Sequence, residues 1–193
     1  MSVDTDSPVE YGFSGPLNWL LGGAVGGIVG SLLFGGVLWL VDPTIVTELI
    51  PALYGLEPGS VGVAFHIGHG LVLGIIFGFL ISREPILGAL TADVATDFIA
   101  AMGPGIRFAL AGFVYGLAIW AIVPMMGQII WVSITGVPEP MFPILAFESM
   151  IGHLLYGLLL GVLFSFFVEV SQSIEETDAP FEEAEDEPET RVS

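Results

Sequence analysis

The stretch His66-Ile-Gly-His-Gly70-Leu-Val-Leu-Gly74-Ile-Ile-Phe-Gly78 decides the fold, together with a second copy of its pattern, His153-Leu-Leu-Tyr-Gly157-Leu-Leu-Leu-Gly161. Both copies read His-x-x-x-Gly-x-x-x-Gly. A four-residue step keeps these positions on one stripe of an α-helix. Because the residues around them are mostly Leu, Ile, Val and Phe, each copy predicts an apolar helix that carries a glycine groove headed by an imidazole.

Charged residues are rare and unevenly placed in this chain. Of its 193 residues, 54% are hydrophobic and 12% are charged, which is not the balance of a soluble globular domain. Apart from histidine and tyrosine, no ionisable side chain lies in 11–41, 58–82, 108–138 or 149–168. Since about 20 helical residues cross a bilayer core, each run predicts one membrane-spanning helix. We therefore expect an integral membrane protein in a lipid bilayer.

The expected helices cover about 17–41, 60–82, 106–124 and 144–168. Proline cannot continue a helical hydrogen-bond ladder, and the first and third helices share a Trp-x-x-x-Pro ending, Trp39 to Pro43 and Trp120 to Pro124. Gly35 and Gly116 each stand four residues before the tryptophan.

If these two helix ends are equivalent, the segment 125–142 corresponds to the segment 44–59 in the repeat. Both segments are apolar but too short and broken to cross, so we expect them along the membrane interface, with Tyr54 at headgroup level. A third segment, about 91–102, predicts an amphipathic helix on the membrane surface.

The chain therefore reads as two helical hairpins, 17–82 and 106–168. Each crosses the membrane twice, so the two copies have the same orientation. We predict an all-α fold, an integral membrane four-helix bundle made of two parallel-repeat hairpins. The acidic ends, 1–16 and 169–193, are expected to be disordered tails.

The formal net charge is −18, with three Lys or Arg residues against 21 acids. Such a balance repels phosphate and excludes a nucleic-acid partner. It matches a high-salt cytoplasm, where carboxylates repel each other weakly, so we interpret the source as a halophile. Arg83 and Arg107 flank the loop between the hairpins, which favours the cytoplasmic side for that loop and for both termini, in a multi-pass protein of the cell membrane.

Ten glycines are predicted to form helix-packing faces, because small residues let helix backbones approach closely. They are Gly22, Gly26, Gly30, Gly70, Gly74, Gly78, Gly112, Gly116, Gly157 and Gly161. The same strings lie inside apolar spans and not after a strand, which argues against a dinucleotide site.

All three histidines lie in the second and fourth helices, and an ionisable group inside a membrane is a functional candidate. One hypothesis is a metal site or proton relay of His66, His69, His153 and Glu148. The other is that neutral imidazoles donate to a carbonyl or to Tyr115 or Tyr156. Packing is favoured, because Glu148 and His153 share a helix face poorly and lie in no His-Glu-x-x-His motif. With no cysteine in the chain, disulfides, thiolate metal sites and Cys nucleophiles are excluded.

Four strings resemble an uncharacterised family of small four-span membrane proteins of haloarchaea. They are Asn18-Trp-Leu-Leu-Gly-Gly, Trp39-Leu-Val-Asp-Pro, Leu90-Thr-Ala-Asp-Val and Gly152-His-Leu-Leu-Tyr-Gly. The resemblance covers about 17–168 and implies location and topology, not chemistry. Relatives are sometimes labelled histidine kinase, but this chain has no ATP-binding domain and no nucleotide-cradling loop, so at most it would be a detached sensor module.

Three functions are compatible with the sequence. The first is a non-enzymatic bundle that assembles with itself or with a partner membrane protein through glycine faces. The second is a transport or channel component whose path is lined by His66, His69 and His153. The third is a membrane protein that binds metal or haem, with His66 and His153 as paired haem ligands. No kinase or hydrolase motif supports an enzyme.

Overall fold

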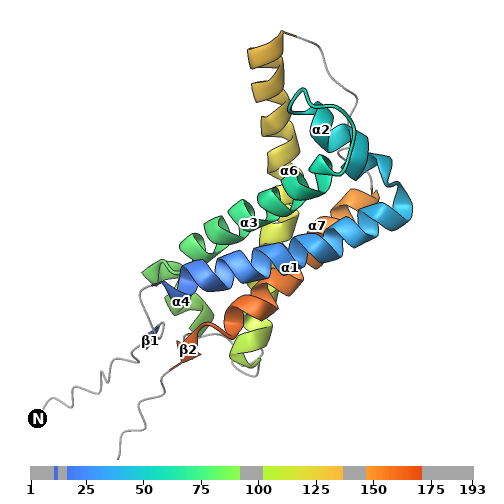
Figure 1. Ribbon diagram of the computed structural model, residues 1–193. Coiled ribbons are helices and arrows are strands. Elements are labelled where there is room, and N and C mark those ends of the chain that lie inside the picture. The colour runs from blue at the N-terminus through green and yellow to red at the C-terminus, as the bar shows by residue number, and fades with distance from the viewer. Residues whose placement is uncertain (1–10, 13–16, 92–101, 137–146, 171–193) are drawn as a thin grey trace, which may run out of the picture.

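Four long helices build the structure, a computed structural model that describes residues 11–12, 17–91, 102–136 and 147–170 (Figure 1). They are α1 (Asn18–Val41), α3 (Val61–Ile81), α6 (Pro104–Thr135) and α7 (Phe147–Ser165). Each holds a stretch long and apolar enough to cross a membrane, which in α6 is Gly105–Ile122. The expected all-α four-helix bundle is confirmed, and the chain has the character of a multi-pass membrane protein.

Short elements join the long helices. A π-helical turn, Ile45–Leu49, runs into α2 (Ile50–Ala52), and α4 (Glu84–Thr91) follows α3. A two-residue antiparallel strand pair, β1 (Tyr11–Gly12) with β2 (Glu169–Val170), lies near α4 at one end of the bundle (Figure 1).

Several predicted segments fall wholly or mostly outside the described residues. These are the expected interfacial helix at about 91–102 and the expected disordered tails, 1–16 and 169–193, of which the structure describes only the two strands. Residues 137–146, which include the expected start of the fourth helix, also lie outside.

The segment after α1 packs against the start of α3. Val46, Ile50 and Pro51 are buried, and Gly62 of α3 lies directly against the carbonyl oxygen of Val46, where a Cβ would collide. Tyr54, expected only at headgroup level, also contacts α3 through its ring, which stacks on Phe65 at 4.2 Å between centroids.

The third helix does not stop at Pro124, so that expected boundary is corrected. α6 runs on to Thr135 and projects past the other helices (Figure 1). The α1 ending differs because the Asp42 carboxylate accepts hydrogen bonds from Thr44, from its amide at 2.9 Å and its hydroxyl at 2.7 Å. These bonds hold the chain in a turn that competes with the helix. Val123 offers no such acceptor, and a membrane helix tolerates the single bond that Pro124 removes.

α1 packs against two helices through two adjacent glycine stripes. Gly23 and Gly27 touch the backbone of α3, with Gly27 against the carbonyl oxygen of Gly70. Gly22, Gly26 and Gly30 touch α7 at Phe164, Leu160 and Tyr156. In both pairs residue numbers rise along one helix as they fall along the other, so α1 is antiparallel to α3 and to α7.

The second hairpin repeats the first in its backbone contacts. Gly112 lies against the carbonyl of Gly157 as Gly27 lies against that of Gly70. Gly116 therefore takes the place of Ser31 and not of Gly35, so the equivalence expected from the Trp-x-x-x-Pro endings is one helical turn out of register. The Trp-x-x-x-Pro endings give the wrong register because α1 ends before its proline, whereas α6 continues past Pro124.

Aromatic rings fill the centre where the helices meet. Phe77, Phe108 and Phe164 are fully buried, and Phe164 packs edge-on against Phe77 at 5.4 Å between centroids. The outside is also apolar, with Leu40 88% exposed and Val114 63% exposed. In water such a surface would be an association hazard, whereas in a bilayer it is the lipid-facing surface.

Candidate intramembrane histidine site

His66 is held on α3 by the backbone of α1. Its Nε2 donates to the carbonyl oxygen of Ser31 at 3.0 Å, and its ring meets Phe34 edge-on, 5.3 Å between centroids. Gly35 makes room for this arrangement, because a Cβ there would lie 3.1 Å from Cδ2 of the imidazole. The contact matches the packing hypothesis, in which an imidazole donates to a carbonyl across helices.

His153 is held by its own helix. Its Nδ1 lies 2.8 Å from the carbonyl oxygen of Ser149 and 3.5 Å from the hydroxyl of the same residue. Since a carbonyl only accepts, Nδ1 carries the proton, and it cannot act as a base toward the Ser149 hydroxyl. The ring meets Phe34 at 4.6 Å between centroids.

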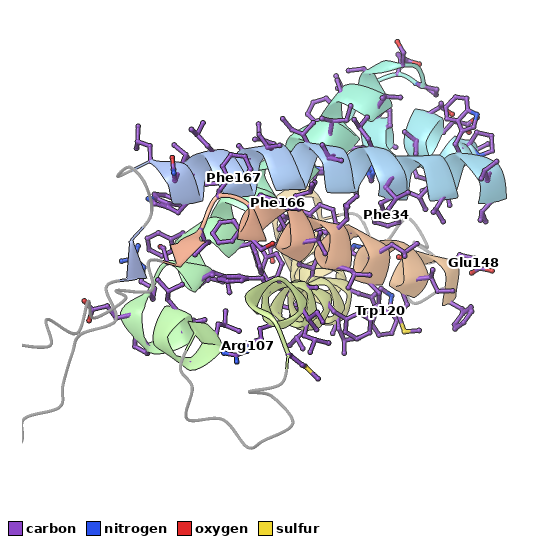
Figure 2. All side chains as sticks on the ribbon, turned by 90° about the horizontal axis from the view of Figure 1, so that it is seen from below. Phe34, Arg107, Trp120, Glu148, Phe166 and Phe167 are labelled. Carbon is purple, nitrogen blue, oxygen red and sulfur yellow. The ribbon has the colours of Figure 1, made fainter. Side chains whose placement is uncertain are left out.

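Phe34 of α1 thus contacts both imidazoles, and it also fills the space against Gly152, where a Cβ would collide with its ring. Figure 2 shows it on the inner side of α1, toward α7. A haem bound through its iron by His66 and His153 would need the position of this ring. The haem hypothesis therefore does not fit the arrangement of these residues.

His69 belongs to a separate group. Its Nε2 is hydrogen-bonded to the hydroxyl of Tyr54, and the two rings stack at 5.8 Å between centroids. Because Tyr54 lies after α2, this bond ties the connecting segment to α3, one turn beyond His66.

The two intramembrane tyrosines bind backbone and not histidine. Tyr115 of α6 donates to the carbonyl of Leu73 at 2.7 Å, and Tyr156 of α7 donates to that of Gly70 at 2.8 Å. Both acceptors are on α3, so these hydroxyls connect the second hairpin to the first. The expected pairing of imidazoles with Tyr115 or Tyr156 is corrected, because His66 and His153 are hydrogen-bonded to the carbonyls of Ser31 and Ser149 instead.

Glu148 stands apart from the histidines, exposed in the first turn of α7, on the outside of the bundle (Figure 2). Within the described part of the chain, no group of three or more His, Cys, Asp or Glu residues could hold a metal ion. The four candidates are divided among the Phe34 cluster, the Tyr54 pair and the exposed helix end.

The predicted packing glycines lie at helix crossings. A Cβ on any of the ten would come within 3.0 Å of another helix. They are therefore used by contacts within one chain.

Two important residues of the site had no role in the sequence analysis. Ser31 could have been found, because it continues the four-residue stripe of Gly23, Gly27 and Gly35. Phe34 carried no signal that distinguished it from the other aromatic residues. Its role arises from the packing of α1 against two helices at once.

Comparison with known proteins adds no assignment to this geometry. No protein-family model, curated protein or solved structure matches the chain.

Proposed function

We propose that this chain is a non-enzymatic multi-pass membrane protein that acts by assembly, and that a second copy binds to the outer face of α3. One observation carries the proposal: Gly68 has no neighbour. Within the described residues of the four spans, only Gly36 and Gly68 are glycines with nothing within 4 Å of the position of a Cβ. Glycine weakens a helix by up to about 1 kcal/mol relative to alanine. At Gly68 no packing contact within the described part of the chain offsets this cost, so we look for a contact outside the chain.

The residues around Gly68 form a stripe that fits another helix. Ala64, Gly68, Val72 and Ile76 follow at four-residue steps on α3, and Val72 is 56% and Ile76 43% exposed. A small-x-x-x-small pair in an apolar helix lets a second helix approach closely. The ridges first expected to mediate assembly are filled by the chain's own helices, so this outer stripe takes over that role. Because closed two-fold dimers are the commonest assemblies, we assign it to a second copy.

The polar groups inside the bundle support a structural role and not catalysis. His66 and His153 hold backbone carbonyls, as do Tyr115 and Tyr156. The bonds of His66, Tyr115 and Tyr156 join two helices, and such bonds contribute roughly 0.6 to 2 kcal/mol each. The bond of His153 lies within α7.

Both termini are proposed to face the cytoplasm. The strand pair formed by β1 and β2 lies at the same end of the bundle as α4 (Figure 1), which Arg83 directly precedes in the chain and to which Arg107 is hydrogen-bonded. Arg107 is buried there and donates to the carbonyls of Met102 and Leu90, each at 3.1 Å. The guanidinium carbon of Arg83 lies 3.7 Å from the ring centroid of Phe79. Basic residues favour the cytoplasmic side.

Cysteine crosslinking in native membranes tests the assembly, because the natural chain has no cysteine. Val72→Cys should give a disulfide-linked dimer, whereas Val114→Cys, on the equally exposed surface of α6, should not. Adding Gly68→Leu should lower the dimer fraction several-fold, and Gly36→Leu should leave it unchanged. Equal crosslinking at Val72 and Val114, or a Val72 adduct only with a different protein, would refute self-assembly through this face.

A further inference from the structure

The second glycine without an internal contact, Gly36, borders a cavity. The cavity lies between α1, the π-helical turn and α3, and has a volume of about 230 Å³. Gly35, Gly36 and Trp39 of α1 form one wall, Val63 and His66 of α3 the other, and Val46 closes one end. A Cβ at Gly36 would meet nothing within 4 Å, so the absence of a side chain there keeps the cavity open.

The cavity is reached from the lipid side of the bundle. Leu32 and Trp39, which both line it, are each 53% exposed, and Val63 is 37% exposed. All three belong to the surface that faces the acyl chains when the helices span a bilayer. A ligand that enters here must therefore dissolve in the membrane.

His66 gives the cavity one specific polar group. Its Nε2 donates to Ser31, so in the neutral imidazole Nδ1 has a free lone pair and accepts hydrogen bonds. Among the described residues, the indole nitrogen of Trp120 is the only fully buried side-chain nitrogen or oxygen without a hydrogen-bond partner. The Nδ1 of His66, which has no hydrogen-bond partner in the described part of the chain, is therefore not a fully buried atom. Because His66 lines the cavity, this ring nitrogen is the acceptor that we assign to a ligand there.

The volume limits the size of that molecule. An apolar cavity of about 150 Å³ holds one benzene ring, and drug-sized ligands occupy about 300 to 1,000 Å³. A cavity of about 230 Å³ thus fits one or two fused rings, and the exposed indole of Trp39 offers an aromatic face for them.

We infer that this cavity binds a lipid-soluble aromatic alcohol, a one- or two-ring hydroxyl compound of the quinol type, whose hydroxyl donates to Nδ1 of His66. The site goes beyond the proposed assembly and uses a different face of α3. It requires neither a second copy nor a redox step.

Binding of 2-naphthol to the purified full chain tests the inference, with naphthalene as the matched ligand that lacks the hydroxyl. Tryptophan fluorescence reports binding, because Trp39 lines the cavity, and Trp39→Phe should remove most of the signal. We expect naphthalene to bind about threefold to tenfold more weakly than 2-naphthol, the effect of one neutral hydrogen bond. His66→Phe should weaken 2-naphthol by the same factor and leave naphthalene unchanged.

Gly36→Leu places a side chain at the cavity and should abolish binding of both compounds, while Gly68→Leu adds the same side chain on another face and should preserve it; a Cβ at either position meets nothing within 4 Å. Helical circular dichroism of both variants checks that each one folds. Unchanged binding in Gly36→Leu would overturn the site. Equal affinity for naphthalene and 2-naphthol would overturn the role of His66. Loss of binding in Gly68→Leu would show that the signal came from the dimer and not from the cavity.

Discussion

Replacing Gly27 with alanine would place a methyl group against the carbonyl oxygen of Gly70 and within 3.0 Å of the Cα of Gly74. Ordinary contact for a Cβ begins near 3.4 Å, and the atoms in its way are backbone, which cannot rotate aside. α1 and α3 must therefore separate. A gap of about 0.5 to 1 Å forfeits a quarter to a half of the dispersion attraction across a contact.

Overpacking of this kind costs about 1 to 3 kcal/mol or more, against a gain of up to about 1 kcal/mol in helix propensity. We expect Gly27→Ala to lower the free energy of unfolding by about 1 to 2 kcal/mol. Gly36→Ala is the matched control, because it adds the same methyl group to the same helix in open space. It should be neutral or slightly stabilising.

The assay is reversible unfolding in mixed micelles, with helical circular dichroism followed as denaturing detergent is added. Gly112→Ala should behave like Gly27→Ala, because its Cβ would meet the carbonyl of Gly157 in the same way. If Gly27→Ala and Gly36→Ala unfold at the same detergent fraction, backbone contact between α1 and α3 does not hold the first hairpin together.

Three further outcomes are expected. Tyr156→Phe should lower the free energy of unfolding by about 0.6 to 1.5 kcal/mol in the same assay, because it removes the hydrogen bond to the Gly70 carbonyl but leaves that carbonyl its partner within the helix. An unchanged free energy of unfolding would mean that the bond does not form in lipid. The hydrogen bonds from Thr44 lower the pKa of the exposed Asp42 carboxyl below its ordinary 3.8, so they support the end of α1 at neutral pH and are lost as pH falls through that lowered pKa. A carbon NMR titration should show this pKa rising toward 3.8 in Thr44→Val, and no change would reject the turn. Finally, we propose a halophilic source, so helical dichroism should persist in molar salt and decline in dilute buffer; the reverse would contradict it.

The sequence was sufficient to predict the four spans and the faces on which glycines gather, because hydropathy and a four-residue period depend only on local positions. It could not assign partners to those faces. Gly22 and Gly23 are neighbours in sequence, yet one touches α7 and the other α3. The end of α6 was missed because a proline alone does not stop a membrane helix.

The candidate site was predicted in its residue types but not in its grouping. His66 and His69 lie three residues apart, yet His66 shares Phe34 with His153, while His69 is bonded to Tyr54. The cavity beside Gly36 was not foreseen, because Gly36 and Gly35 are indistinguishable in the sequence. Only the helix positions show that one contacts His66 and the other faces open space.

Direct contact between glycine backbones holds each of the two alike hairpins together. A Cβ on Gly74 would lie 2.7 Å from the Cα of Gly27, and one on Gly157 would lie 2.9 Å from the Cα of Gly116. Solid-state NMR of the protein in lipid bilayers, with carbon-13 only at glycine Cα, tests both contacts in one spectrum. We expect cross-peaks for Gly27 with Gly74 and for Gly116 with Gly157. A spectrum that lacks either cross-peak would show that the glycine backbones of that hairpin are not in contact.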